Sequence, residues 1–496
     1  MTKRNLRYVF IIILFCLSLF IFTALLGFAW MKALFGAVSL EQILFHLSFP
    51  LEGADTKVIR SFILKVIIPS LLLSVFMTSP YKSIQFSLKY LSLFIRWCKK
   101  YFLYLRFRYA LCALLLIAVC IIAERRLSIS TFVVNAAQKQ YSQFYEQYYV
   151  APQPIHTDTP NNLIVIFSES LESTFSSKYG GGEYPEFIPH LSELALSNTY
   201  FSDTETFGGI TQVANTGWTI AGLVSYLCAV PLHLPIDGNS FNNTHFLDSA
   251  VCVSDILSGL GYTQLMLIGS DAKFAGRGHF FSTHKIPYKD LISYKKEQKI
   301  PKNYNVHWGF EDSKLFAFAK EELENLYQAN TPFALYILTT DTHFPDGFVD
   351  STFCPDLQDG YRNAVQCSDR IIKDFIDYAQ NLTKSYEQPT TIVVLGDHLS
   401  MKQGLFPPHS KRRIYNTFIN ASFSITPTDD LLYRRNLSHF DMTPLLLDSL
   451  GMNVQAFGLG RNPLYSKTLL ETFGLESFNK HLTQPSRFYE DLWRTK

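Results

Sequence analysis

Charged side chains follow four short apolar runs of this sequence, at the point where each run ends. The runs and the side chains behind them are Asn162–Phe167 with Glu169, Gln264–Gly269 with Asp271 and Arg277, Phe333–Thr339 with Asp341 and His343, and Thr391–Gly396 with Asp397 and His398. Carboxylates and imidazoles bind metals and move protons, and arginine binds phosphate. One such group alone is also explained by a polar turn, but four groups at four run ends indicate a metal or phosphate site.

A threonine is the candidate nucleophile. Thr219 stands where a glycine-containing loop, Gly208–Trp218, meets an apolar segment with a helical pattern. The free N–H groups at a helix N-terminus attract anions such as phosphate. From local sequence alone, Thr219 is explained at least as well as a helix N-cap, and Thr216 is the rival nucleophile.

The elements that must position these groups form an α/β pattern. The four apolar runs alternate with amphipathic stretches such as Asp312–Gln328 and Ser368–Leu382. This alternation predicts a doubly wound, mostly parallel sheet, whose strands are apolar throughout because helices cover both faces. Ligands of such sheets bind beyond the carboxyl ends of the strands, so the charged groups are expected to converge there.

The N-terminal part has the character of a membrane domain. The chain is 48% hydrophobic, which is high for a soluble enzyme, and three apolar stretches are candidate transmembrane helices: Tyr8–Trp30, Ser61–Met77 and Tyr101–Ala123. We therefore expect a membrane domain over residues 1–124, a linker over 125–160 and a catalytic domain over 161–496.

Basic residues predict the topology. Residues 1–150 contain 17 Lys and Arg against 5 Asp and Glu, whereas residues 151–496 contain 27 against 37. The basic N-terminus is expected in the cytoplasm, and the basic segment Tyr81–Arg108 is typical of a cytoplasmic interfacial helix. If the chain spans the membrane three times, the large domain lies outside the cytoplasm. If the third stretch does not span the membrane, the large domain lies in the cytoplasm. Nothing in the charge pattern suggests nucleic-acid binding.

The cysteines offer an independent test of that location. The large domain contains Cys228, Cys252, Cys354 and Cys367. An even number of cysteines outside the cytoplasm predicts two disulfides. Proximity in sequence favours Cys228–Cys252 and Cys354–Cys367 among three possible pairings, and four buried free thiols are the alternative.

Several motifs resemble the alkaline phosphatase/sulfatase superfamily. The closer similarity is to its membrane-anchored branch of lipoteichoic-acid synthases, phosphoethanolamine transferases and, nearest, the phosphoglycerol transferase I type. The resemblance runs from about Gln42 to Ser466 and rests on these motifs: "ILFHLSFPLEG", "NLIVIFSESLEST", "WTIAGLVSYLCAVPL", "SDAKFAGR", "HWGFED", "TTDTHFPDGF" and "VVLGDHLSM". It implies an enzyme in the bacterial inner membrane, multi-pass, with its catalytic domain in the periplasm.

The resemblance also implies roles for particular residues. Glu169, Asp397 and His398, with the Thr219 hydroxyl, would bind one divalent metal, Mn²⁺ foremost and Zn²⁺ or Mg²⁺ otherwise. Thr219 would attack a phospholipid and carry a phospho-threonine intermediate. His343 would act as general acid and base and contact the substrate.

Three further residues would bind the lipid donor. Arg277 would grip the head-group phosphate, Phe274 would pack against the glycerol, and Asp271 would contact head-group hydroxyls. The implied reaction moves phosphoglycerol from phosphatidylglycerol to a glycan acceptor such as a periplasmic glucan. The alternative is a phosphoethanolamine transferase acting on lipid A, lipopolysaccharide core or glycan.

The sequence alone leaves the roles of several other residues open. Glu172 is the rival of Glu169 as a ligand, and His307, Asp312, His439 and Asp441 fit packing or capping as well as chemistry. Asp341 is also explained as a turn residue. The linker aromatics Phe144, Tyr145, Tyr148 and Tyr149 suggest an interfacial membrane anchor. A sulfatase is disfavoured because its C/S-x-P-x-R motif is absent at Thr219, and a fold that has lost its chemistry would not retain the ligand set.

Overall fold

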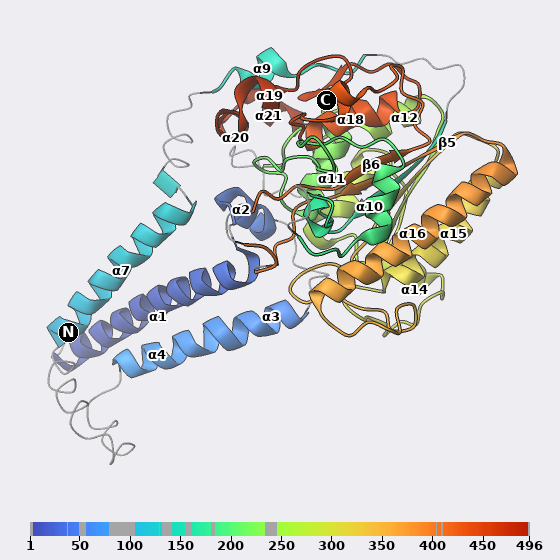
Figure 1. Ribbon diagram of the computed structural model, residues 1–496. Helices are drawn as coiled ribbons and strands as arrows, with labels where there is room; N and C mark the ends of the chain where they lie inside the picture. The colour runs from blue at the N-terminus through green and yellow to red at the C-terminus, as the bar shows by residue number, and fades with distance from the viewer. Residues whose placement is uncertain are drawn as a thin grey trace. The chain divides into compact units, whose positions relative to one another are not determined.

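The chain forms two compact units. The computed structural model describes residues 3–36, 38–48, 56–78, 105–127, 129–130, 141–153, 161–179, 184–233, 246–402, 404–407 and 410–494. One unit comprises Met1–Leu40 and Ala54–Val134, and the other comprises Glu41–Gly53 and Asn135–Lys496. We call them the N-terminal unit and the catalytic unit, and each is described by itself (Figure 1).

The N-terminal unit is helical. Its elements are α1 (Lys3–Phe35), α3 (Thr56–Phe62), the π-helical turn η1 (Ile63–Ile67), α4 (Ile68–Thr78) and α7 (Leu105–Leu127). A small apolar cluster joins α1, α4 and α7, with Leu14, Met77 and Cys112 at its centre. The helices are therefore held by their apolar faces.

Two stretches among the described residues are long and apolar enough to cross a membrane: Tyr8–Phe35 and Thr56–Thr78. They contain the first two predicted spans. The third predicted span is the helix α7, but its apolar stretch is bounded by Arg108 and Glu124, and it does not meet the same criterion of length and composition. The third span stays a prediction. Most of the expected interfacial helix falls in 79–104, outside the described residues.

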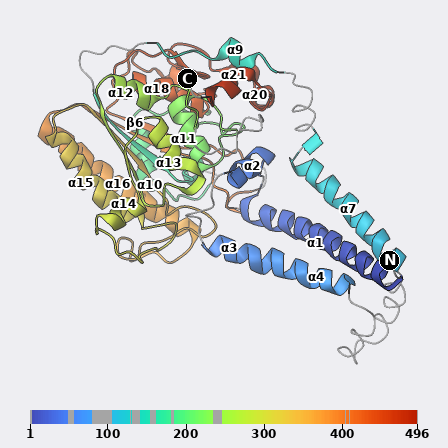
Figure 2. The ribbon, with the colours of Figure 1, turned by 180° about the vertical axis from the view of Figure 1, so that it is seen from behind.

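A six-stranded sheet forms the centre of the catalytic unit. Its strands are β1 (Asn162–Ser168), β2 (Thr263–Ile268), β3 (Tyr288–Lys289), β4 (Phe333–Leu338), β5 (Thr390–Gly396) and β6 (Asn416–Ile419). Their order is β3-β2-β4-β1-β5-β6, and only β6 is antiparallel to its neighbour. Figure 2 shows the sheet from behind, with helices on both of its sides. The mostly parallel sheet is confirmed, and the four predicted strands are β1, β2, β4 and β5.

Helices cover both faces of the sheet. One layer contains α10 (Pro189–Leu196), α14 (Leu291–Lys296), α15 (Asp312–Gln328) and α16 (Tyr361–Tyr386), and the other contains α11 (Thr219–Cys228), α12 (Val253–Gly259) and α18 (His439–Asp448). Every residue of β1, β4 and β5 is buried. This two-sided burial explains why these strands are continuous apolar runs in the sequence.

Short elements complete the unit. They are α2 (Leu40–Ser48), α9 (Phe144–Tyr148), η2 (Ser173–Phe175), η4 (Phe274–Gly276), α13 (Arg277–Thr283), α17 (Asp429–Leu432), β7 (Ala456–Phe457), β8 (Gly460–Arg461), α19 (Leu469–Phe473), α20 (Leu475–Leu482) and α21 (Arg487–Leu492). β7 and β8 pair as a separate two-stranded sheet.

The expected membrane anchor in the linker is wrong for two of its aromatic residues. Phe144 is 5% exposed and stacks on His481, with ring centroids 4.8 Å apart. Tyr145 is fully buried, and its hydroxyl donates to the Leu482 carbonyl over 3.0 Å. The C-terminal helices supply an apolar surface that the linker sequence could not reveal.

Both predicted disulfides are confirmed: Cys228–Cys252 and Cys354–Cys367. The first joins the last residue of α11 to the N-cap of α12. It therefore ties the helix that begins with Thr219 to the neighbouring helix.

Candidate active site

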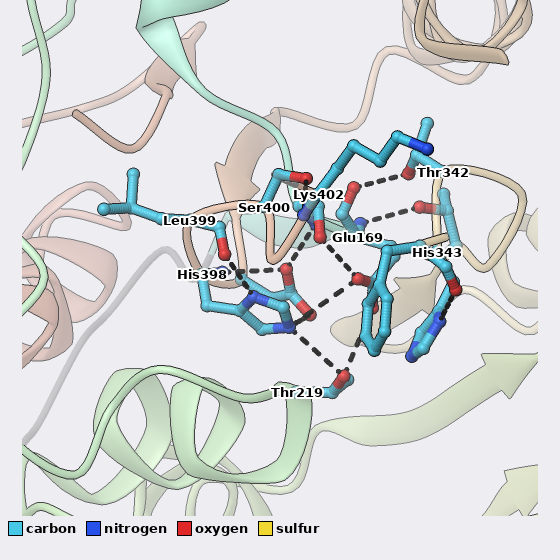
Figure 3. Close-up of polar contacts among 12 residues, drawn as sticks. Glu169, Thr219, Thr342, His343, His398, Leu399, Ser400 and Lys402 are labelled. Carbon is cyan, nitrogen blue, oxygen red and sulfur yellow. Dashed lines mark hydrogen bonds and ion pairs between the residues drawn. The ribbon is translucent and has the colours of Figure 1, made fainter. Parts of the chain in front are cut away.

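The register of the sheet brings the candidate ligands together. Ser168 and Gly396 are partners in the parallel pair β1–β5, so Glu169 and Asp397 follow directly from adjacent positions. Figure 3 shows Glu169 between the imidazoles of His398 and His343, with Thr219 facing both Glu169 and His398. The predicted convergence at the carboxyl edge of the sheet is thus observed for these strands.

Three buried side chains form a candidate site for a divalent metal. One ligand atom each from Glu169, Asp397 and His398 lie within 4.8 Å of one another. His398 Nε2 is 3.6 Å from Glu169 Oε1 and 3.5 Å from Asp397 Oδ2, and each side chain is at most 2% exposed. Two carboxylates and an imidazole are a ligand set suited to Mn²⁺, Zn²⁺ or Mg²⁺.

Main-chain contacts orient His398 as a ligand. Its Nδ1 lies 2.9 Å from the Leu399 carbonyl oxygen, which can only accept a hydrogen bond. Nδ1 therefore carries a proton, and Nε2, which faces the two carboxylates, is the nitrogen available to a metal. This is the arrangement that a metal-binding histidine requires.

The surroundings of the Asp397 carboxylate disfavour its negative charge when no cation is bound beside it. Its Oδ1 accepts hydrogen bonds from the Ser170 and His398 N–H groups, but Oδ2 has no hydrogen-bond partner among the described residues. Burial, together with the charge of Glu169, raises the pKa of Asp397 to about 8. A bound cation would offset this cost, so the residues present fit a metal.

Thr219 is the first residue of α11 and not its cap. The N-cap is Trp218, and the Thr219 hydroxyl instead lies 3.2 Å from Glu169 Oε2 and 3.5 Å from His398 Nε2. The rival Thr216 is fully buried, and its hydroxyl donates to the Val213 carbonyl over 2.9 Å. Only Thr219 of the two is directed at the carboxylates.

A glycine allows α11 to approach the end of β5 closely. A Cβ atom added at Gly222 would lie 2.3 Å from the Asp397 carbonyl oxygen. One turn later, the Tyr226 hydroxyl donates to the Gly396 carbonyl over 2.6 Å. These contacts fix Thr219 relative to Asp397, which explains the need for glycine in the "TIAG" motif.

Arg277 is a buried cation without a carboxylate partner among the described residues. It is 5% exposed, and its Nε and Nη2 donate to the carbonyls of Phe274 and Asp271 over 3.1 and 2.7 Å. Burial lowers its pKa to about 10. The Asp271 carboxylate accepts from the Lys273 N–H and shapes this turn. A buried arginine whose hydrogen bonds go to carbonyls, and whose guanidinium lies over the Phe274 ring, keeps its charge available for an anion.

His343 lies beside the carboxylates on the loop after β4. Its Nδ1 is 2.8 Å from the Phe344 carbonyl oxygen, and its ring centroid is 4.2 Å from that of Trp308. Burial lowers the pKa of His343, although the charge of Glu169 opposes this. Burial thus favours the neutral imidazole, in which Nε2 carries no proton, whereas the charge of Glu169 favours the protonated form.

Comparison with known proteins identifies the family. Residues 161–452 match the Sulfatase family model. The chain belongs to the sulfatase family. Phosphoglycerol transferase I of Escherichia coli (strain K12) is 30% identical over 375 residues, which cover 74% of this chain and 47% of that protein. The chain thus spans about half the length of the curated relatives it matches.

Two solved structures of other proteins are similar to this sulfatase-family chain at low sequence identity. The lipoteichoic acid synthase LtaP from Listeria monocytogenes is 17% identical, with a TM-score of 0.47 over 65% of this chain and 80% of that one. The integral membrane lipooligosaccharide phosphoethanolamine transferase A from Neisseria meningitidis is 12% identical, with a TM-score of 0.48 over 87% and 83%.

The alternative ligand Glu172 has a structural role in this sulfatase-family site. It forms a buried ion pair with Arg412 and accepts hydrogen bonds from the Ser400 N–H over 2.9 Å and the Thr174 hydroxyl over 2.7 Å. With these partners its oxygens are satisfied, and it does not join the Glu169 cluster.

Two buried aspartates position the loop that carries His343. Asp312, at the start of α15, accepts from the N–H groups of Thr340 and Asp341, and Asp341 accepts from the Asp312 N–H over 2.9 Å. Asp341 is therefore more than a turn residue. His307 lies behind the same loop, with Nε2 3.3 Å from the His343 carbonyl oxygen.

Residues of the helix α18 help to hold the main chain of the site in place. His439 Nε2 lies 2.9 Å from the Asp397 carbonyl oxygen, and Asp441 forms a capping box with Ser438. The packing and capping interpretation is correct for both residues. Sequence reasoning gave no role to Trp218, which directly precedes Thr219, or to Trp308, whose ring contacts that of His343, although both fall inside motifs that carried the resemblance.

Proposed function

We propose that this sulfatase-family protein transfers phosphoglycerol from phosphatidylglycerol to a glycan hydroxyl outside the inner membrane, through a phospho-threonine at Thr219. The observation that carries the proposal is the Thr219 hydroxyl, 3.2 Å from Glu169 and 3.5 Å from His398. The 30% identity to a phosphoglycerol transferase I supports the choice of transferred group.

Different residues of the chain carry out different parts of the proposed reaction. When bound by Glu169, Asp397 and His398, a divalent metal, Mn²⁺ foremost, would supply positive charge that favours ionised hydroxyls and phosphate oxygens. Thr219 passes its proton to Glu169 and its oxygen forms a bond to phosphorus, while the bond from phosphorus to the diacylglycerol oxygen breaks. An acceptor hydroxyl then attacks the same phosphorus. The bond from phosphorus to the Thr219 oxygen breaks, and Glu169 returns the proton to that oxygen.

His343 handles the second proton of each step. In the first step the protonated imidazole donates a proton to the departing diacylglycerol oxygen and becomes neutral. In the second step the neutral imidazole removes a proton from the acceptor hydroxyl and is protonated again. A pKa lowered by burial suits the second role, because a neutral imidazole is the competent base. The charge of Glu169 raises that pKa and so supports the first role.

Arg277 is expected to bind the phosphate of the donor. Arg277→Ala should raise KM for the lipid about tenfold to a hundredfold, the usual effect of losing a charged hydrogen bond. Arg277→Lys should recover part of the loss, because lysine keeps the charge but not the planar fork. Diacylglycerol release at varied lipid concentration measures this.

The matched control is Arg370→Ala, which removes an arginine paired with Asp356 on the surface. It should leave KM unchanged. An unchanged KM in Arg277→Ala as well would exclude the phosphate-binding role.

The fold also supports a periplasmic catalytic domain reached by three spans. α2 follows the first membrane-length helix in sequence and belongs, from Glu41, to the catalytic unit. The two must share a compartment, so the chain crosses the membrane an even number of times between Ser48 and Asn162. Thr56–Thr78 supplies one crossing, and α7 is the helix available for the other.

A donor experiment tests the function. Full-length protein with manganese is given phosphatidylglycerol or phosphatidylethanolamine, and diacylglycerol release and the mass of the peptide containing Thr219 are followed. We expect a glycerophosphate adduct on Thr219 with phosphatidylglycerol only. A phosphoethanolamine adduct would establish the alternative transferase, and no product from either lipid would refute both.

A further inference from the structure

A helix that follows the first membrane-length stretch forms part of the catalytic unit. α2 contains Phe45, which is fully buried, with its ring centroid 5.9 Å from that of Trp218 and 6.3 Å from that of Phe246. A helix of nine residues is too short to be stable alone. Its packing against the catalytic unit therefore holds it in place.

The next residue, His46, lies among the aromatic rings beside the nucleophile. Its ring centroid is 6.4 Å from that of Trp218, which precedes Thr219, and 6.2 Å from that of Phe274. The Phe274 ring lies 5.3 Å from the Trp308 ring, which in turn contacts His343. A continuous series of rings thus connects α2 to the general acid and base of the proposed reaction.

The polar atoms of this aromatic group match a molecule that both donates and accepts hydrogen bonds. His46 Nδ1 lies 2.8 Å from the Gln42 carbonyl oxygen, so it carries the proton and leaves Nε2 as an acceptor. Burial lowers the pKa of His46 and keeps the ring neutral. The Nε1 groups of Trp218 and Trp308 are buried donors with no partner among the described residues.

Buried N–H groups without partners are costly, so an acceptor from a bound molecule is expected at these indoles. A hydroxyl both donates and accepts, whereas an ammonium group only donates. Beside these aromatic rings, His46 offers one acceptor, and Trp218 and Trp308 offer two donors. This combination therefore suits a polyol head group better than ethanolamine.

We propose that His46 is a substrate-contacting residue of the lipid-donor site, whose Nε2 accepts a hydrogen bond from a hydroxyl of the glycerol head group. Trp218 and Trp308 donate to oxygens of the same head group, and α2 thereby helps to determine which lipid is used. This inference rests on the proposed phosphoglycerol transfer and assigns head-group recognition to a segment far from the catalytic residues in sequence.

The test compares two lipids in two proteins. His46→Phe keeps an aromatic ring but removes the acceptor. Phosphatidylglycerol is compared with a phosphatidyl-1-propanol of the same acyl chains, which lacks both free hydroxyls. We expect kcat/KM for phosphatidylglycerol to fall about threefold to tenfold, the effect of one neutral hydrogen bond, with little change for phosphatidylpropanol.

His481→Phe is the matched control, because His481 is also half-buried and stacks on an aromatic ring, that of Phe144. It should leave the preference between the two lipids unchanged. If His46→Phe does not fold, His46→Gln retains an acceptor and should keep part of the preference.

The outcomes separate the two proposals. Equal losses on both lipids would mean that His46 only supports packing, and would overturn this inference alone. A larger loss with phosphatidylpropanol than with phosphatidylglycerol would also overturn it, because His46 would then not act through the head-group hydroxyls. Failure of the unmodified protein to release diacylglycerol from phosphatidylglycerol would refute the proposed function and this inference with it.

Discussion

Thr219→Ala is expected to abolish transfer while the protein still folds. Without the hydroxyl no phospho-threonine can form, so diacylglycerol release should fall at least about a thousandfold, as when other enzymes lose their nucleophile. Folding should survive because Thr219 is only half-buried and the α11 cap is the preceding residue. Metal affinity should fall modestly, since Glu169, Asp397 and His398 remain.

The control for this prediction is Thr216→Ala, which deletes the hydroxyl of the rival threonine three residues earlier. It should cost some stability, because a buried hydrogen bond to the Val213 carbonyl is lost, but it should keep the activity. The assignment would be refuted by more than a few per cent of activity in Thr219→Ala, or by inactivity of a folded Thr216→Ala protein.

The second large effect concerns the metal and pH. The pKa of Asp397 in the metal-free fold is about 8, above its unfolded value of about 3.9. A group with a raised folded pKa binds more protons in the folded state. Stability from this group is therefore present below about pH 4 and is lost as the pH rises toward 8. Metal-free protein should thus be less stable at pH 8 than at pH 6.

A bound divalent metal should reverse this loss, because it stabilises ionised Asp397. Manganese at a hundred times its Kd should add about 2.7 kcal/mol to the free energy of unfolding. At one fixed manganese concentration, the increase in Tm should be larger at pH 8 than at pH 6, because protonated Asp397 binds the metal more weakly. Asp397→Asn should remove the response to metal, since the amide keeps Oδ1 as an acceptor but is a poor ligand.

Asp369→Asn is the control, because Asp369 is a buried carboxylate of α16, away from the Glu169 cluster, whose pKa burial raises to about 7. It should change the pH dependence of stability without changing the effect of manganese. Thermal melting with and without metal, together with metal analysis of purified protein, measures both variants. A full metal response in Asp397→Asn would exclude Asp397 as a ligand.

The surfaces that bury α2 and α9 could not be predicted from the pattern of apolar residues alone. The sequences of α2 and α9 contain apolar and aromatic residues, but they do not identify the surface that covers them. Tyr145 was expected at a membrane interface and is instead buried beneath the C-terminal helices. Phe45 and His46 belong to the catalytic unit although two membrane-length helices flank them in sequence.

Four of the six strands, and the charged groups that follow them, could be predicted from the sequence, because strands buried on both faces are apolar throughout. The strand order is a finding of the structure: β1 and β5 are neighbours, and this brings Glu169 and Asp397 together. The short separations of the cysteines likewise favoured the disulfides that form.

Only the tertiary structure decided between neighbouring residues of the same type. Glu169 and Glu172 are equally able to bind a metal, but Arg412 approaches from a distant segment and neutralises Glu172. Contacts between distant segments also distinguish the two threonines. The Thr219 hydroxyl faces the Glu169 carboxylate, whereas the Thr216 hydroxyl donates to the nearby Val213 carbonyl. The physical reason is that ligand geometry and charge compensation depend on contacts between remote segments, which local pattern does not contain.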